Sequence, residues 1–216
     1  MAAKAASSAL AAGLGTLALD PDLAEPLIAY RDLLARWNRV YNLSAVRDAQ
    51  AMVPRHLLDS LAVLPHLPAG PLLDVGTGPG LPGIPIAIAQ PSRPVTLLEA
   101  NGKKARFLRQ ARLELGLENV EIAEVRLEHY QSEAGFAVII CRAFSEALAF
   151  WQGVAPLLAD DGLAIAMKGR RDEAELAALT KAGVSWQAQD LTVPGLEAER
   201  HLLLLKGAAS ATGQSS

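Results

Sequence analysis

The hydrophobic pattern of residues 71–207 alternates between two periods. Short apolar runs, typical of buried strands, are separated by longer amphipathic stretches, typical of helices. This alternation predicts an α/β protein with a parallel sheet and helices on both faces. The runs predict strands at 71–75, 95–100, 120–124, 137–141 and 163–168, and the stretches between them predict helices at 83–90, 102–115, 145–158 and 171–182.

The end of the chain has a different pattern. Two apolar segments at 186–193 and 200–207 are separated by Pro194–Gly195, a pair that favours a turn. We therefore expect a C-terminal antiparallel hairpin, which brings the sheet to seven strands.

The first part of the chain predicts helices. Asp20 is a candidate N-cap before Pro21, and apolar residues then recur at helical spacing, with a second helix predicted at 49–64. The Ala-rich stretch 1–19 is expected to be a loose or helical arm. The predicted organisation is an N-terminal helical extension (1–67), a core (68–207) and a disordered tail (208–216).

Composition narrows the class of protein. Hydrophobic residues make up 51% of the chain, enough for a packed core, and no apolar run reaches the roughly 18 residues of a membrane span. The single cysteine, Cys141, excludes an internal disulfide and a multi-cysteine zinc site. The net charge of −3 excludes a generally basic surface. We expect a cytoplasmic monomer without a membrane segment or a metal site.

A glycine-rich loop follows the first predicted strand in "LLDVGTGPGLPG" (72–83). Gly76, Gly78 and Gly80 alternate with other residues, and Gly83 opens a helix. Glycines at such a turn allow the backbone to approach a ligand closely. A loop of this kind occurs in nicotinamide, flavin and methyl-donor enzymes, so it does not identify the ligand alone.

Two acidic residues and one apolar residue near this loop favour S-adenosylmethionine, a methyl donor, as its ligand. Asp74, two residues before the first glycine, is compatible with a ligand that carries an ammonium group instead of a pyrophosphate. In the register that begins at Gly76, Leu81 replaces the small residue of the dinucleotide pattern. Glu99 ends the second strand, where an acid commonly accepts hydrogen bonds from ribose hydroxyls.

Residues 37–169 carry a resemblance to a known family. The chain resembles the ribosomal RNA small subunit methyltransferase G family, also called glucose-inhibited division protein B. The residues after 169 match less distinctively. The matching stretches are "WNRVYNLSAV" (37–46), "HLLDSLAVLPHL" (56–67), "LLDVGTGPGLPGIPIAIAQP" (72–91), "LLEANGKKARFL" (97–108), "LGLENVEI" (115–122), "CRAF" (141–144) and "AMKG" (166–169).

The resemblance implies a fold, a reaction and a set of residues. The fold is the Rossmann-like class I methyltransferase fold, and the reaction is methylation of N7 of one guanine in 16S ribosomal RNA, alone or in the small ribosomal subunit. Cys141 replaces a serine that is common in the family, a small change. The implied S-adenosylmethionine-binding residues are Gly76, Gly78, Leu81, Glu99, Leu127, Glu128 and Arg142.

The chemistry of the candidate residues agrees with this reaction. Guanine N7 has no proton to remove, so positioning matters more than a general base. "CRAFS" stands after the fourth strand, where amino-group methyltransferases have a [D/N]-P-P-[Y/F] motif. Cys141 ends an apolar strand and is interpreted as a buried hydrophobic residue instead of a nucleophile. His56 and Asp59, at i and i+3, are interpreted as a hydrogen-bonded structural pair.

RNA binding by an acidic chain requires local positive charge. We expect the group after the fifth strand, together with part of the N-terminal arginine group, to contact phosphates, because ligands bind at the carboxyl edge of such a sheet. The alternatives are a methyltransferase for a small molecule or a protein, a nicotinamide-dependent oxidoreductase, and a non-catalytic binding protein. The basic groups are Lys168, Arg170 and Arg171; Lys103, Lys104, Arg106, Arg109 and Arg112; and Arg36, Arg39, Arg47, Arg55 and His56.

Overall fold

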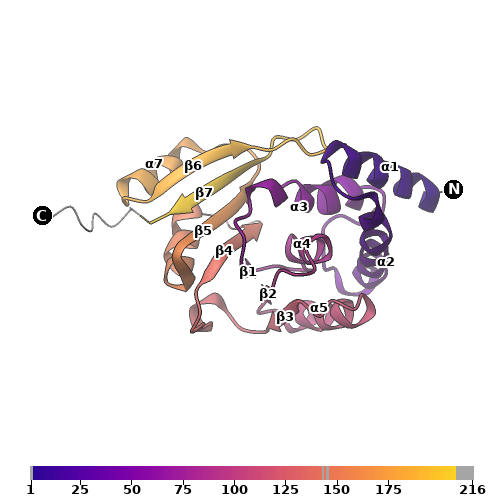
Figure 1. The fold of residues 1–216 in the computed structure, drawn as a ribbon, viewed down its shortest axis with the longest axis horizontal. Helices are drawn as coiled ribbons and strands as arrows, with labels where there is room; N and C mark the ends of the chain where they lie inside the picture. Colours follow the sequence, from indigo (N-terminus) through magenta and orange to yellow (C-terminus); the bar gives the residue numbers. More distant parts are fainter. Residues whose placement is uncertain (1, 143, 145, 208–216) are drawn as a thin grey trace, which may run out of the picture.

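A seven-stranded sheet crosses the computed structural model, which describes residues 2–142, 144 and 146–207 (Figure 1). The strand order is β3-β2-β1-β4-β5-β7-β6, and β7 runs in the direction opposite to that of the other six strands. This confirms the predicted class I methyltransferase topology with a C-terminal hairpin. The strands are β1 (Leu72–Val75), β2 (Val95–Leu98), β3 (Val120–Ala123), β4 (Phe136–Arg142), β5 (Leu158–Lys168), β6 (Ser185–Asp190) and β7 (His201–Lys206).

Side chains along the strands alternate between two apolar clusters, one on each face of the sheet. In β1, Leu72 belongs to one cluster and Leu73 to the other, as the period-two pattern of a strand requires. The helices α4 (Gly83–Ala89) and α5 (Gly102–Glu114) complete the first cluster, while α6 (Ala147–Val154) and α7 (Glu173–Lys181) complete the second. The four helices predicted between the strands are therefore present, with shorter ends.

The N-terminal helices pack on the first face. They comprise α1 (Ala2–Thr16), α2 (Ala24–Tyr41), a π-helical segment η2 (Val53–Leu58) and α3 (Asp59–Leu61). Leu10 and Leu14 of α1 are fully buried, and Gly13 lies against Leu58 so closely that a Cβ atom would collide with it. Within the predicted arm, Ala2–Thr16 thus forms a helix that is docked onto the protein.

Two predicted elements differ from the structure. The helix predicted at 49–64 begins later and is irregular: Val53–Leu58 is π-helical with Pro54 in its first turn, Asp59–Leu61 is α-helical, and a 3-10 turn follows at Leu64–His66. The hairpin does not turn only at Pro194–Gly195: the connection runs over 191–200 and is closed by a 2.8 Å bond from the Leu191 amide to the Arg200 carbonyl.

The long connection matters because it lies beside the N-terminal helices: Gly195 and Pro54 line the same two cavities. The tail predicted at 208–216 and the first residue of the helix predicted at 145–158 lie outside the described residues. Every helix in the described part of the chain is too short or too polar to cross a membrane.

Candidate functional site

The glycine loop lies at the carboxyl edge of the sheet, directly after β1. Gly76, Gly78 and Gly80 have φ values of 64°, 63° and 96°. Residues with a side chain rarely adopt these values, so the loop requires glycine at all three positions.

Asp74 anchors both ends of this loop. Its Oδ2 atom accepts hydrogen bonds from the Thr77 hydroxyl at 2.5 Å and from the Gly83 amide at 2.7 Å. The side chain is fully buried, and its Oδ1 atom has no hydrogen-bond partner among the described residues. Burial raises the pKa of Asp74 from 3.8 to about 6, although the two hydrogen bonds oppose this change. Asp74 therefore holds the loop in its conformation through these two hydrogen bonds.

The raised pKa of Asp74 predicts a pH-dependent stability. Because the folded state binds the proton more tightly than the unfolded chain, the contribution of Asp74 is complete below about pH 4 and is lost as the pH rises through about 6. We expect wild type to lose up to about 3 kcal/mol relative to Asp74→Asn across this window. Urea unfolding of both proteins at several pH values measures the difference. Parallel stability curves would contradict the assignment.

Glu99 joins the end of β2 to the loop. Its Oε2 atom accepts a hydrogen bond from the Gly78 amide at 2.9 Å, and its Oε1 atom accepts one from the Asn101 amide at 2.8 Å. The Lys104 ammonium lies 3.9 Å from Oε2. Each carboxylate oxygen retains a further lone pair, so Glu99 can still accept hydrogen bonds from hydroxyl groups.

Open space beside Gly76 makes the loop suitable for a ligand. A Cβ atom on Gly76 would meet no atom within 4 Å, whereas one on Gly80 or Gly83 would collide with side chains of the core. The open backbone at Gly76 and the acceptor oxygens of Glu99 fit a nucleoside with free hydroxyls. These residues therefore fit the predicted methyl donor.

The remaining predicted donor residues occupy different surroundings. Leu81 is buried in the core, 2% exposed, and its amide bonds to the Thr77 carbonyl. Leu127 and Glu128 lie in a 3-10 turn, η4 (Leu127–His129), which follows β3 at the same edge of the sheet. Leu127 packs against Gly153 of α6, while Glu128 is exposed. Gly78 and Glu99 are thus hydrogen-bonded to each other, and η4 lies at the same edge of the sheet as these two residues.

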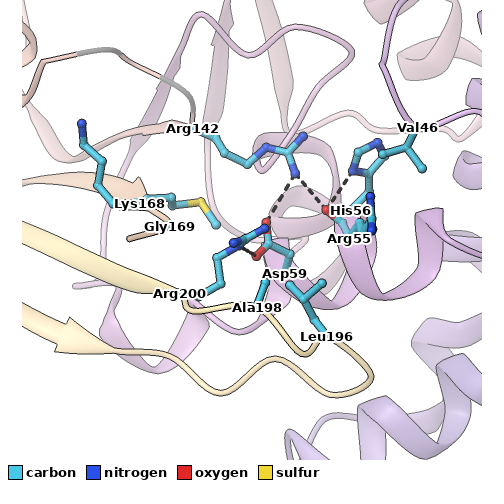
Figure 2. Close-up of a pocket in the computed structure, with 11 residues that line it drawn as sticks. Val46, Arg55, His56, Asp59, Arg142, Lys168, Gly169, Leu196, Ala198 and Arg200 are labelled. Atoms are coloured by element: carbon cyan, nitrogen blue, oxygen red, sulfur yellow. Dashed lines mark hydrogen bonds and ion pairs between the residues drawn. The ribbon is translucent and has the colours of Figure 1, made fainter. Parts of the chain in front are cut away.

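Arg142 points into a separate cavity of about 560 Å³ at the carboxyl ends of β4 and β5 (Figure 2). We call this cavity the basic pocket. Among the described residues that line it, Asp59 is the only one with a carboxylate. The pocket is lined by the basic residues Arg55, Arg142, Lys168 and Arg200, by His56 and Asp59, and by Val46, Met167, Gly169, Leu196 and Ala198.

Asp59 pairs with two arginines that line the basic pocket, Arg142 at the end of β4 and Arg200 directly before β7. Its Oδ2 atom lies 3.4 Å from Nη1 of Arg142, and its Oδ1 atom accepts a hydrogen bond from Nε of Arg200 at 3.0 Å. The Asp59 side chain is 3% exposed, whereas the two arginine side chains are 23% and 27% exposed. Arg142 also donates from Nη1 to the Arg55 carbonyl, and Arg200 donates from Nη1 to the Glu199 carbonyl. A guanidinium carries five N–H groups, so each arginine still has donors for a ligand.

His56 has a structural role in the wall of this pocket. Nδ1 lies 2.8 Å from the Arg55 carbonyl, and Nε2 lies 2.7 Å from the Ser44 hydroxyl. Burial, assisted by the charge of Arg142, lowers the pKa of His56 to about 4. The neutral ring must donate from Nδ1 to the carbonyl and accept from Ser44 at Nε2. His56 and Asp59 therefore bond to other partners, and the expected direct pair is not what the structure shows.

Several of the predicted basic residues are already paired. The Lys168 ammonium lies 2.6 Å from Glu175 and is 12% exposed, and Arg171 lies 2.6 Å from Asp190. Arg170 is exposed and lines a neighbouring cavity that also includes Arg200. Among the other groups, Arg36 pairs with Glu114 and Arg109 with Glu124. These pairs reduce the positive charge available to a phosphate.

Cys141 is buried in β4, as the sequence predicted. Burial raises the pKa of its thiol far above the ordinary value. A thiol that remains protonated is a poor nucleophile, so the residue serves in packing.

Solved structures share the fold at low sequence identity. A glycopeptide N-methyltransferase, MtfA, complexed with S-adenosylmethionine has a TM-score of 0.60 and 11% identity over 71% of this chain and 87% of that chain. A ribosomal protein L11 methylase from Lactobacillus delbrueckii subsp. bulgaricus has a TM-score of 0.53 and 16% identity over 70% of this chain and 77% of that chain. Both are similar in fold.

Curated relatives are much closer in sequence. Proteins named ribosomal RNA small subunit methyltransferase G are 48% identical, from Methylobacillus flagellatus over 91% of this chain and 96% of the relative, and from Methylococcus capsulatus over 94% and 98%. Residues 23–203 match the GidB family, described as rRNA small subunit methyltransferase G. By both comparisons, the chain belongs to the rRNA small subunit methyltransferase G family.

Proposed function

We propose that this protein transfers a methyl group from S-adenosylmethionine to N7 of a guanine in 16S ribosomal RNA of the small ribosomal subunit. Membership of the family supports the substrate class. The observation that carries the proposal is the bond between Gly78 and Glu99 beside the open face of Gly76, at the same sheet edge as the basic pocket. The proposed donor site and the proposed acceptor site would therefore share one edge of the sheet.

The proposed donor site follows the sequence prediction. Glu99 accepts hydrogen bonds from the ribose hydroxyls, and the loop glycines allow the backbone to lie close to the donor. The turn after β3 flanks the adenine. Arg142 ends β4 between the two sites, and its guanidinium faces the acceptor side. The proposed donor-binding residues are Gly76, Gly78, Leu81, Glu99, Leu127, Glu128 and Arg142.

The proposed acceptor site is the basic pocket. The sulfonium of the donor supplies an activated methyl group, and guanine N7 presents a lone pair without a proton. The chain therefore needs to position the base and exclude water, not to remove a proton. The surroundings of His56 suit this role, because both ring nitrogens are engaged and the ring is neutral at physiological pH. Arg142 and Arg200 supply donors for a phosphate or for guanine O6.

A single labelling experiment tests the proposal. The protein is incubated with labelled S-adenosylmethionine and small subunits that lack the modification, and the labelled nucleotide is mapped. We expect one guanine labelled at N7. A label on protein or on a small molecule alone would support the alternative of a methyltransferase with another acceptor.

We further propose a cytoplasmic monomer in which residues 1–67 form the helical extension of the 68–207 core.

Glu99→Ala is expected to weaken donor binding by about 1–3 kcal/mol, because ribose hydroxyls lose a charged acceptor. Titration calorimetry with S-adenosylmethionine measures the change. Glu118→Ala is the matched control, since this exposed carboxylate follows α5 away from the loop. Equal affinity of wild type and Glu99→Ala would exclude the ribose assignment.

A further inference from the structure

Helix α2 contacts the glycine loop through one buried hydroxyl group. The Tyr30 hydroxyl donates a hydrogen bond of 2.8 Å to the carbonyl of Pro79, which lies between Gly78 and Gly80. Tyr30 is completely buried, and burial raises the pKa of its hydroxyl, which therefore remains a donor. Without this bond, the Pro79 carbonyl would lose its partner inside the protein.

The other end of α2 is bonded to the wall of the basic pocket. Asn38 donates from Nδ2 to the Val46 carbonyl at 3.0 Å and accepts from the Ser44 amide at 2.8 Å. Ser44 in turn bonds to His56 at 2.7 Å. Val46 and His56 both line the basic pocket. Asn38, which is 4% exposed, therefore holds two of the residues that form this wall.

Both bonds arise from one face of one helix. Tyr30 and Asn38 are separated by two sets of four residues, with the buried Leu34 between them, so they lie about 12 Å apart along the helix axis. The helix is continuous from Ala24 to Tyr41. A rigid element of fixed length is thus attached to the donor loop at one point and to the pocket wall at another.

We propose that α2 is a spacer that sets the position of the donor loop relative to the basic pocket, with Tyr30 and Asn38 as positioning residues. The inference rests on the proposed function, because methyl transfer requires the reacting atoms to meet in line at about 3–3.5 Å. A displacement of about 1 Å lowers such a rate by about two orders of magnitude. Neither residue contacts a reacting atom.

The test compares Tyr30→Phe with Leu33→Val. Tyr30→Phe removes only the hydroxyl, whereas Leu33→Val trims a buried side chain of the same helix that has no polar contact. We expect Tyr30→Phe to raise the Kd for S-adenosylmethionine about three- to tenfold, as loss of one buried hydrogen bond implies. We expect its single-turnover methylation rate, with donor and small subunits both saturating, to fall as well. Leu33→Val should retain both values.

Asn38→Ala tests the opposite end. It is expected to weaken small-subunit binding and to lower the saturated rate, while the Kd for S-adenosylmethionine stays at the wild-type value. A Tyr30→Phe protein with unchanged donor affinity and rate would overturn the inference, as would a weaker donor Kd with an unchanged saturated rate. Wild type that binds no S-adenosylmethionine would instead contradict the proposed function, so the two failures are distinguishable.

Discussion

Deleting residues 1–67 is expected to abolish the cooperative thermal transition of the remaining chain. The N-terminal helices and the first face of the sheet share a single apolar cluster, so deletion would expose α4 and α5 to water. Burial of each large apolar side chain contributes about 1.5–3 kcal/mol, and many are lost together. The buried apolar residues removed include Leu10, Leu14, Leu27, Tyr30, Leu33, Leu34, Met52, Leu57, Leu58 and Leu61.

The expected loss exceeds the total stability of an ordinary domain, about 5–15 kcal/mol. Circular dichroism and scanning calorimetry of residues 68–207 provide the measurement. Removal of 208–216, the proposed disordered tail, is the control and should leave the transition unchanged. A cooperative transition of 68–207 near the wild-type temperature would contradict the shared core and would make the extension an independent addition.

The strands could be predicted because each one carries a local pattern. The central parallel strands β1 and β2 are buried on both faces, and β4 and the second half of β5 are mostly buried, which gives short apolar runs that the sequence displays directly. The start of β5 was missed because Asp160 and Asp161 are exposed and interrupt the apolar run before Leu163. The extent of the connection at 191–200 is not visible in the sequence, because the residues beside it, such as Pro54, lie far away along the chain.

Some features of the candidate site could likewise be predicted from the sequence, and others could not. The loop and Glu99 could be identified because glycines at a strand end and an acid at the next strand end form a local spacing pattern. The bond between Asp59 and Arg200 joins residues 141 positions apart, and the bond between Tyr30 and Pro79 spans 49 positions. A buried polar side chain on a helix does not reveal its partner, because the partner is fixed by the tertiary fold.

Asp59→Ala is expected to destabilise the protein by about 3 kcal/mol, the lower end of the range for removing one partner of a buried ion pair. Two guanidinium groups, on Arg142 and Arg200, would remain without their shared counter-ion. The lower end applies because about a quarter of each arginine side chain is exposed, so water can screen part of the charge. Urea unfolding measures the loss of stability.

Asp190→Ala is the matched control for Asp59→Ala. Asp190 also pairs with an arginine, Arg171, but the two side chains are 78% and 47% exposed, and such surface pairs contribute about 0–1 kcal/mol. If both variants lost the same stability, the buried position of Asp59 would not explain the effect.

Binding measurements distinguish the basic pocket from the donor site. Without Asp59 the two arginines lose their fixed orientation, so Asp59→Ala should weaken small-subunit binding several-fold. Donor affinity should fall less than small-subunit binding, because Asp74 and Glu99 still anchor the donor loop and Arg142 is only one of the proposed donor-binding residues.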